Sequence, residues 1–565
     1  MRVGLGKFLG VLLGVLVTGA CVVAPIANAM PPYPGLEKSS PEMAASVAKY
    51  KEAMATFAAR GINQHGPGLA AGTQLSGNFN MLVVCVRFTD HDSSVSATDF
   101  DDLIFSQVSS SVWDYYHEVS YGNFDVVSVD LPSSIGWQTM PSPYSYYVNN
   151  NYGFGSYPQN TQKLCEDVVD AIDGVVDFAD YDNDGNGYVD GIIIVHSGTG
   201  AELSGQTTDI WSHKWGITPR LRDGVYISDY SIQPEYWLSP GDITIGVYCH
   251  EIGHVFGLPD LYDIDGSSRG IGKWSLMANG SWNGSLGNSP AHVDAWCRIE
   301  LGFVSPTIVN SSLTNVNIPS IESTPTIFRL WEDGTVGSEF FLVENRQKTG
   351  YDSYIPSSGL LIWHVDETQT SNSKEWYPGH TSTGHYWVAL EQADGLWEIE
   401  QNTDYGDSGD PFPGSTNQTF FSAASTPSSD AYSGTPTYVT ITNISSSSPT
   451  MTCDFQVSLG TGVNDGETWA TAALPEQYVV NQPNPFNPST LISYYVTARG
   501  HVTLDIYDIL GRRVRTLVSD DVEPGRYTVE WNGADDQGRQ AASGVYFARM
   551  ATPQYQKTHK MVLVR

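Results

Sequence analysis

A short motif at residues 250–254 constrains this chain more than any other stretch. It runs His250-Glu251-Ile-Gly-His254. Positions four residues apart lie on one face of an α-helix, so both histidines can reach one zinc ion at roughly 2.0–2.1 Å. Glu251 lies on the adjoining edge, where it can accept a proton from a water molecule as general base. The motif therefore predicts a hydrolytic zinc site on a helix.

The residues after the motif predict where the helix ends and what completes the ligand set. Gly257 allows the chain to turn back, and Pro259 cannot continue a helix. Asp260 follows, ten residues after the first histidine, at the position of the third ligand in the long zinc motif. Aspartate is an acceptable zinc ligand. We therefore predict that Asp260 is the third protein ligand.

Three other residues bear on this site. Met277 follows Asp260 after a short loop, where metzincin peptidases place a Met-turn beneath the metal. Glu300, in a helix predicted over residues 290–301, is the alternative third ligand, because thermolysin-like zinc peptidases take a glutamate from a later helix. His213 is not needed as a ligand, since the stretch 250–260 already supplies a full set.

At these residues the chain resembles the immune inhibitor A family of secreted bacterial metallopeptidases. The matching stretches are 250–263, which ends in Leu-Pro-Asp-Leu-Tyr-Asp, and 274–278, Trp-Ser-Leu-Met-Ala. The resemblance extends over residues 80–455 or so, and it implies a zinc endopeptidase. The fold class that it implies is multidomain, with an α/β metzincin-like catalytic domain followed by all-β sandwich domains.

The N-terminus is typical of an exported protein. Residues 1–29 begin with positive charge, continue with an apolar run and end in Ala27-Asn28-Ala29, a small-x-small cleavage site, so we predict a signal peptide. A lipid anchor on Cys21 is the alternative. No later stretch is long and apolar enough to predict a membrane span. Residues 30–75, with a helical patch near 41–59, are predicted to be a propeptide or N-terminal extension; the alternative is a structured arm that is never removed.

Charge and cysteine content narrow the function classes. The net charge is −34 although only 16% of residues are charged, because lysine and arginine are scarce. So acidic a chain is a poor partner for nucleic acid and suits an exported protein that binds calcium.

Five cysteines remain after removal of the signal peptide, so at most two disulfides can form, with one thiol left over. They are Cys85, Cys165, Cys249, Cys297 and Cys453; we expect Cys249 to be buried beside the zinc site and not to be a ligand.

An acidic loop at residues 180–190 predicts a calcium site. Oxygen donors recur at alternate positions, and Gly185 stands where a calcium loop turns sharply. The bidentate glutamate of a standard EF-hand loop is missing, because Gly191 occupies that place. The alternative is a solvated acidic turn, and the stretch 404–410 is a weaker second candidate. The predicted calcium ligands are Asp180, Asp182, Asp184, Asn186 and Asp190.

The hydrophobic pattern divides the chain into regions. Residues 76–304 are predicted to form the catalytic domain, and 305–457 a β-sandwich, since short alternating strands replace the earlier helices. Residues 458–476 are a predicted linker. Expected strands are 81–88, 191–196, 339–347, 359–366 and 386–394, and expected helices are 99–107, 111–122 and 160–176.

The last region, residues 477–565, is predicted to be a separate all-β unit with strands at 502–511, 543–550 and 560–565. It resembles the C-terminal sorting domain of type IX-type secretion, which is related to the flagellar hook-capping immunoglobulin-like fold. The resemblance implies recognition by secretion machinery and export to the cell surface or the medium. An adhesion module is the alternative for this region.

Taken together, these features predict a secreted zinc-dependent endopeptidase that hydrolyses proteins or peptides. The cofactors expected are a catalytic zinc ion and structural calcium. The rival function is a non-catalytic, calcium-stabilised surface adhesin that carries an inactive peptidase domain. Glu251 discriminates between the two, because an adhesin has no need of a general base.

Overall fold

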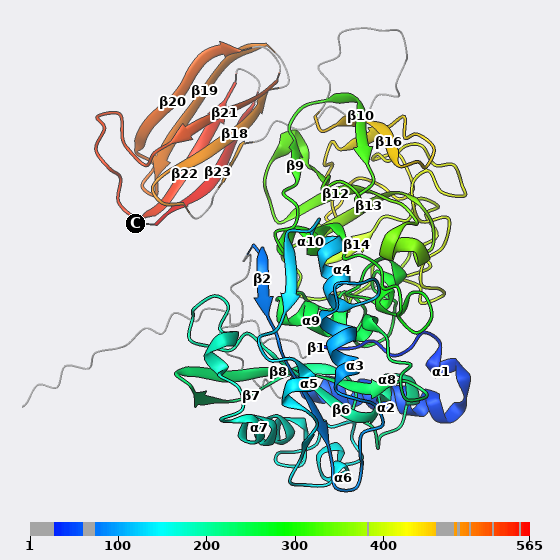
Figure 1. The fold of residues 1–565 in the computed structure, drawn as a ribbon. Helices are drawn as coiled ribbons and strands as arrows, with labels where there is room; N and C mark the ends of the chain where they lie inside the picture. The colour runs from blue at the N-terminus through cyan, green and yellow to red at the C-terminus, as the bar shows by residue number, and fades with distance from the viewer. Residues whose placement is uncertain are drawn as a thin grey trace, which may run out of the picture. The chain divides into compact units, whose positions relative to one another are not determined.

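The chain folds into two compact units, Met1–Ser458 and Leu459–Arg565, in a computed structural model (Figure 1). The structure describes residues 28–59, 74–380, 384–458, 479–482, 486–496, 499–522, 525–552 and 555–564. Most of the predicted signal peptide, including Cys21, lies outside the described residues, as do 60–73 of the predicted propeptide and 459–476 of the predicted linker. The prediction of a multidomain chain is confirmed.

A six-stranded sheet forms the framework of the larger unit. Its order is β1-β7-β8-β6-β3-β5. The strands β8, β6, β3 and β5 are parallel, whereas β7 runs antiparallel to β8, and β1 runs antiparallel to β7. The apolar runs in β3 and β6 are buried, as expected for parallel strands covered on both faces. The bounds are β1 Asn28–Ala29, β3 Leu82–Arg87, β5 Gln138–Thr139, β6 Ile192–Thr199, β7 His213–Arg222 and β8 Val225–Tyr236.

Helix α9, Ile245–Val255, carries the motif and is buried at every residue. It ends where the sequence predicts, because Gly257 adopts a φ of 92° and turns the chain back. Helix α10, Ala295–Glu300, is shorter than the predicted 290–301, because the Asp294 side chain accepts from Cys297 N and fixes the start of the helix. The remaining helices of this part are α3 Thr98–Phe100, the π-helical turn Asp101–Phe105, α4 Val112–Val119, α5 Pro132–Ile135, α6 Tyr144–Val148, α7 Thr161–Ile172 and α8 Ala201–Ser204; β2 Gly77–Asn80 pairs with β4 Phe124–Val127.

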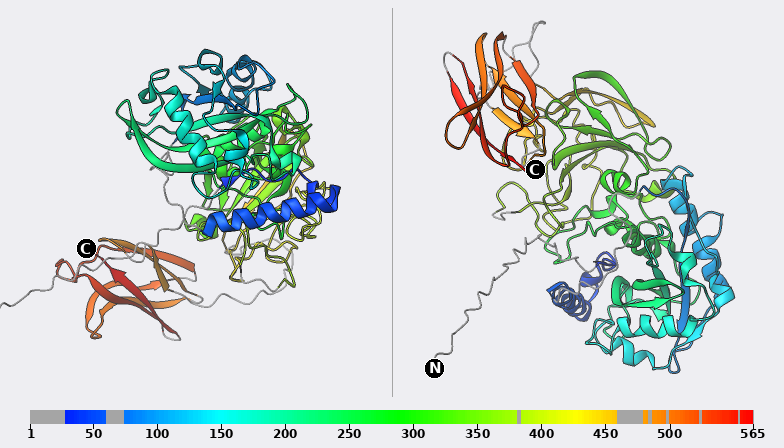
Figure 2. Two further views of the ribbon diagram at one scale, coloured as in Figure 1. Left: turned by 90° about the horizontal axis from the view of Figure 1, so that it is seen from below. Right: turned by 90° about the vertical axis from the view of Figure 1, so that its left-hand side faces the viewer.

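The segment before this framework packs onto it. It comprises β1, α1 (Leu36–Ser39) and α2 (Pro41–Ala59), and α2 is the long blue helix in the left view of Figure 2. Tyr50 of α2 is only 2% exposed and stacks on Trp211, with ring centroids 3.5 Å apart. The Tyr152 hydroxyl donates to Ser46 O at 2.8 Å. The N-terminal segment is therefore an integral layer of the larger unit.

The second part of the larger unit consists of two sheets that enclose an apolar core. One sheet has the order β14-β13-β12-β11-β9 and the other β10-β16-β15, and residues such as Phe341 and Phe455 meet between them. The predicted strand 386–394 is reduced to β14, and the Asn372 side chain bonds both the N–H and the C=O of its first residue, Val388. The bounds are β9 Thr307–Val309, β10 Leu313–Pro319, β11 Phe328–Leu330, β12 Glu339–Arg346, β13 Gly359–Asp366, β14 Val388–Leu390, β15 Thr440–Thr442 and β16 Thr450–Gln456.

The smaller unit also contains two sheets, ordered β17-β18-β21 and β20-β19-β22-β23, around a core that includes Trp531 and Ile506. Its strands are β17 Val479–Gln482, β18 Thr490–Val496, β19 Gly500–Asp508, β20 Arg513–Val522, β21 Gly525–Trp531, β22 Gly544–Ala551 and β23 Gln556–Leu563.

Two findings concern the described residues as a whole. None of their helices has both the length and the apolar character that a membrane crossing requires. The five cysteines predicted to remain after signal-peptide removal are all buried as free thiols.

Candidate metal centre

Helix α9 directs two histidine rings toward one point. His250 and His254 are buried, and their Nδ1 atoms lie 2.9 Å from Leu276 O and 2.8 Å from Leu258 O. A carbonyl oxygen only accepts, so each Nδ1 carries the ring hydrogen. The lone pair of each Nε2 is therefore available to a metal ion, and the backbone carbonyls fix the orientation of both rings.

Asp260 completes a triangle with the two histidines. Its Oδ1 lies 3.2 Å from each Nε2, and the two Nε2 atoms are 3.2 Å apart. Ligand atoms in a tetrahedral zinc site at 2.0–2.1 Å from the ion are about 3.3 Å apart. All three atoms present electron pairs, with no ring hydrogen between them. This donor set fits a zinc ion, since only a cation at the centre would relieve the repulsion.

The loop after α9 explains how Asp260 returns to the helix. Leu258 N donates to Gly253 O at 3.0 Å, and Gly257 N donates to His254 O at 3.1 Å, so the chain reverses within one turn. Leu261 N then donates to Met277 O at 2.8 Å, which joins the ligand loop to the predicted Met-turn. Met277 is fully buried, and a Cβ placed on Gly253 would lie 2.7 Å from its Sδ. The methionine therefore packs directly against the motif helix at a position that only glycine leaves open.

Glu251 lies beside this triangle and is fully buried. Burial raises the pKa of its carboxyl well above the usual range, and the Asp260 and Glu202 carboxylates raise it further. The nearby Met30 N–H and the Ser231 side chain oppose that rise. Neither oxygen of Glu251 has a hydrogen-bond partner among the described residues. An unpartnered buried carboxyl next to three metal-ligand atoms has the chemistry of a general acid or base.

The alternative ligands lie elsewhere. Glu300 is half-buried at the end of α10, and the group of metal-ligating atoms among the described residues consists of His250, His254 and Asp260 without it. His213 of β7 contacts Thr161 Oγ1 at 3.0 Å, and burial lowers its pKa to about 4. Cys249 is buried on α9, and its carbonyl accepts from the Tyr116 hydroxyl at 2.7 Å.

The acidic loop brings together three of its five predicted ligands. Carboxylate oxygens of Asp182, Asp184 and Asp190 lie within 4.8 Å of one another. Asp190 is 4% exposed; its Oδ2 accepts from Asn183 N at 2.7 Å, while no described residue bonds its buried Oδ1. Burial raises the pKa of Asp190 to about 6, and Asp184 and Asp182 add to the rise.

The other two predicted ligands of the loop are placed differently. Asp180 is exposed and lies outside the group. Asn186 bonds Asp182 and Asp184 through its backbone N–H, at 3.0 Å each. The weaker candidate stretch also gathers carboxylates, in the groups Asp394, Asp407, Asp410 and Glu398, Asp404, Asp407.

The structure adds a feature that the sequence did not predict. The backbone around Ala29 runs past the metal-ligand triangle, where Ala29 N donates to Asp260 Oδ2 at 3.3 Å. The Tyr262 hydroxyl donates to Ala29 O at 2.5 Å. Tyr262 stands in the stretch that carries the family resemblance, but no spacing in the sequence indicated a role for it.

Comparisons with known proteins agree with this geometry. Residues 90–302 match the family model described as immune inhibitor A peptidase M6, catalytic domain, and residues 489–554 match the FlgD Ig-like domain. The resemblance predicted from the motif residues is thereby confirmed, and the chain combines a peptidase region with an immunoglobulin-like β domain.

Individual relatives match part of the chain. The pre-pro-metalloprotease PrtV of Vibrio cholerae serotype O1 (strain M66-2) is 26% identical over 277 residues, covering 41% of this chain and 29% of that protein. Immune inhibitor A of Bacillus thuringiensis subsp. alesti is 31% identical over 209 residues, covering 31% of this chain and 29% of that protein. The chain therefore spans less than a third of the length of these relatives. The solved structure of FlgD from P. aeruginosa is 18% identical, with a TM-score of 0.13, covering 16% of this chain and 74% of that chain.

Proposed function

We propose that this protein is a secreted zinc-dependent endopeptidase that hydrolyses peptide bonds in proteins. The observation that carries the proposal is the triangle of His250 Nε2, His254 Nε2 and Asp260 Oδ1, with 3.2 Å between each pair of atoms. The unpartnered carboxyl of Glu251 beside it supports hydrolysis and not mere metal storage. The match of residues 90–302 to a peptidase model points to the same reaction class.

Metal binding and proton transfer are assigned to different residues of the site. His250, His254 and Asp260 would hold the ion, which when bound supplies Lewis-acid activation of water and of the scissile carbonyl. Glu251 accepts a proton from the attacking water. It then transfers the proton to the leaving nitrogen. The buried surroundings of Glu251 exclude bulk water from this transfer.

The test is metal content measured together with casein cleavage. The wild type should bind one zinc per chain and, once limited proteolysis has removed residues 30–59, cleave casein. We expect Glu251→Ala to keep the metal and lose cleavage, because it removes the base and leaves every ligand. His254→Ala should lose both. A zinc-loaded wild type without peptidase activity would favour the adhesin, and full activity in Glu251→Ala would show that another group is the base.

The third ligand has its own test. We infer Asp260 from its distance to both histidines, and Glu300 is the competitor that sequence comparison with thermolysin-like peptidases suggests. Asp260→Ala should weaken zinc binding strongly, whereas Glu300→Ala should leave it unchanged. The reverse pattern would favour the thermolysin-like arrangement.

We also propose that Asp182, Asp184 and Asp190 bind a structural calcium ion. The supporting observation is the buried Asp190 Oδ1, which has no described partner and belongs to a group of three carboxylates. Three converging carboxylates repel one another unless a cation lies between them. The loop precedes β6, so the ion would brace the sheet that supports α9.

Two further roles concern the ends of the chain. Residues 30–59 are proposed to be an inhibitory propeptide, because Tyr50 of this segment bonds Met30 O and stacks on Trp211. Met30 directly follows Ala29, whose N–H donates to Asp260 Oδ2. Residues 477–565 are proposed to be a sorting domain that secretion machinery recognises, supported by the FlgD Ig-like match. Limited proteolysis that removes residues 30–59 should raise casein cleavage, and unchanged activity would contradict the inhibitory role.

A further inference from the structure

The N-terminal segment crosses the metal centre as an added strand. In β1, Asn28 pairs with Lys214 and Ala29 with His213, so the segment runs antiparallel to β7, the outermost long strand of the sheet. Strand addition to a sheet edge is a general mode of peptide binding, in which backbone hydrogen bonds hold a chain of any sequence. The segment therefore occupies the position that an extended peptide would take beside the metal ligands.

Backbone contacts continue beyond Ala29. Met30 N donates to Ser212 O at 3.1 Å, and the Trp211 indole N–H donates to Met30 O at 2.8 Å. The Trp282 indole N–H donates to Pro31 O at 3.0 Å. Each of these hydrogen bonds involves a backbone atom of the segment, so none depends on the segment's side chains. Residues 29–31 thus show how this cleft would hold any extended peptide.

In the chain that still carries the predicted signal peptide, the contacts single out one peptide bond, the bond between Ala29 and Met30. On one side of it, Ala29 N donates to Asp260 Oδ2, and Ala29 O accepts from the Tyr262 hydroxyl at 2.5 Å. On the other side, Met30 N donates to Ser212 O at 3.1 Å. The Ala29 carbonyl oxygen therefore faces Tyr262, and the Ala29 N–H faces the carboxylate of the third metal-ligand residue.

We propose that Tyr262 is a catalytic residue, whose hydroxyl donates a hydrogen bond to the carbonyl oxygen of the bond being cut. The proposal rests on the proposed peptidase function and adds to it a residue that was not among the predicted site residues. Tyr262 is 5% exposed and lies two residues after Asp260, so the loop that delivers the metal ligand also delivers this donor.

The role of the Tyr262 hydroxyl follows from the charge that develops on the carbonyl oxygen during peptide hydrolysis. Water adds to the carbonyl carbon and gives a proton to Glu251, a carbon–oxygen bond forms, and negative charge develops on the carbonyl oxygen. The carbon–nitrogen bond then breaks, and the nitrogen takes the proton from Glu251. One water is consumed, and the products are a carboxylic acid and an amine, which become a carboxylate and an ammonium group by transfer of the acid proton to the amine. The Tyr262 O–H strengthens its bond as the oxygen gains charge, so it stabilises the transition state more than the bound substrate.

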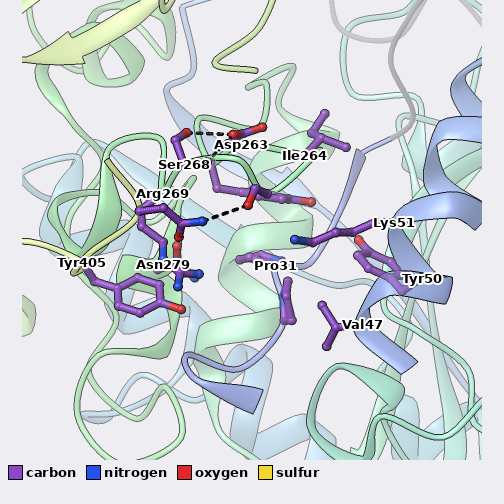
Figure 3. Close-up of a pocket in the computed structure, with 14 residues that line it drawn as sticks. Pro31, Val47, Tyr50, Lys51, Asp263, Ile264, Ser268, Arg269, Asn279 and Tyr405 are labelled. Carbon is purple, nitrogen blue, oxygen red and sulfur yellow. Dashed lines mark hydrogen bonds between the residues drawn. The ribbon is translucent and has the colours of Figure 1, made fainter. Parts of the chain in front are cut away.

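The fold holds this tyrosine in place. Ile271 N donates to Leu261 O at 3.1 Å, so the chain at 270–271 packs on the tyrosine loop. A Cβ on Gly270 would lie 2.5 Å from the Tyr262 Cα, and Gly270 has a φ of 59°, so glycine is required for that approach. Tyr262 also lines a pocket, shown in Figure 3, between Pro31, Tyr50 and Lys51 on one side and Arg269, Asn279 and Tyr405 on the other. The pocket adjoins Pro31, where residues after the cut bond would lie.

The test is Tyr262→Phe made in the full chain, with variant and wild type both freed of the N-terminal segment by limited proteolysis before zinc content, kcat and KM are measured on a peptide substrate. Removal of one donor to the developing charge should lower kcat by about 10²–10³-fold. We expect KM to change less than about threefold and zinc to remain at one per chain. A second readout is independent of turnover: a phosphinic peptide that mimics the tetrahedral state should bind at least tenfold more weakly to the variant, while a product peptide binds equally to both proteins.

The matched control is Tyr116→Phe. It removes another buried tyrosine hydroxyl that bonds a backbone carbonyl, at 2.7 Å, but the carbonyl belongs to α9 and not to the peptide in the cleft. Its kcat should stay within about threefold of the wild type, since no developing charge loses a donor. If Tyr262→Phe does not fold, Tyr262→Leu removes the same hydroxyl, and the same changes in kcat, KM and zinc content are expected of it.

Three results would overturn the proposal. A zinc-loaded Tyr262→Phe whose kcat is within threefold of the wild type would exclude a catalytic hydroxyl. Loss of zinc together with activity would show a structural role. A wild type that stays inactive after removal of the N-terminal segment would remove the proposed function and this inference with it, whereas an active wild type that depends on Glu251 but not on Tyr262 would refute this inference alone.

Discussion

Arg346 offers the sharpest test of how the larger unit is held together. Its side chain is fully buried on β12, and its Nε and Nη2 donate to the two oxygens of Asp352 at 2.7 Å each. Its Nη1 donates to Glu344 Oε1 at 3.2 Å and to Trp274 O at 3.3 Å. Trp274 belongs to the Met-turn stretch, so one guanidinium joins the β-rich part of the unit to the loop beneath the metal centre.

We predict that Arg346→Met lowers the free energy of unfolding by about 3–5 kcal/mol, because it leaves buried carboxylates without their counter-charge. Burial opposes ionisation of Asp352, yet the Arg346 charge holds its pKa well below the usual range. Methionine fills much of the volume of the arginine stem but provides no donor. The Asp352 and Glu344 carboxyls would then lose the arginine donors and the cation together, and each would keep one other donor, His292 N for Asp352 and the Trp363 indole for Glu344.

The assay is urea unfolding of both proteins at pH 7, followed by fluorescence, with the slope compared as well as the midpoint. Arg87→Met is the control, since Arg87 pairs with Asp92 at 3.2 Å in an exposed setting and should change stability by about 1 kcal/mol or less. An Arg346→Met effect no larger than that of the control would refute the reasoning. If the reasoning holds, a fragment that ends at residue 304 should fail to fold, although the sequence pattern changes there.

Three more outcomes follow from the described residues. Burial raises the pKa of Glu202 to about 7 in the folded protein. The contribution of this carboxyl to stability is therefore complete below the ordinary pKa of 4.5 and is lost, by about 3 kcal/mol, as the pH rises through 7. The stability difference between wild type and Glu202→Gln should change between pH 4.5 and pH 8, and a constant difference would contradict the raised pKa. Calcium at 100 times its Kd should stabilise the wild type by about 2.7 kcal/mol and Asp190→Asn by much less, with Asp180→Asn as the control outside the carboxylate group, and a chelated wild type whose melting temperature ignores added calcium would refute the site. A chain that ends at Val457, one residue before the boundary of the larger unit, should cleave casein as well as the full chain but remain in the cell envelope of its native host, and normal export would favour an adhesion module.

Local patterns carried most of the information that the sequence provides about the site. The helical spacing of His250 and His254, with glycine and proline after them, is enough to predict a helix that ends and a carboxylate that returns, and the structure brings Asp260 to both rings. The buried strands β3 and β6 follow equally from short apolar runs. These features depend on neighbours within a few residues, so a single sequence is sufficient to find them.

Features that depend on distant partners were missed. The bond from Tyr262 to Ala29 O joins residues 233 positions apart, and the Trp282 indole donates to a carbonyl 251 positions away. The Arg346 network joins parts that the changing hydrophobic pattern had separated at residue 304. Each of these contacts satisfies a polar group that folding buries, and local periodicity contains no record of which distant group will do so.

The N-terminal segment and the reaction depend on the same donors, and this links activation to catalysis. Trp211 and Trp282 donate to the carbonyls of Met30 and Pro31, so neither can bind another peptide while residues 30–59 are in place, and Tyr262 donates to Ala29 O in the chain that still carries the predicted signal peptide. A substrate gains these bonds only if the segment leaves, and the stacked Tyr50–Trp211 pair must then separate. Because the donors are already oriented by the fold, removal of the segment would require no rearrangement of the metal centre. The residues that would keep the precursor inactive are thus those that would recognise the substrate backbone.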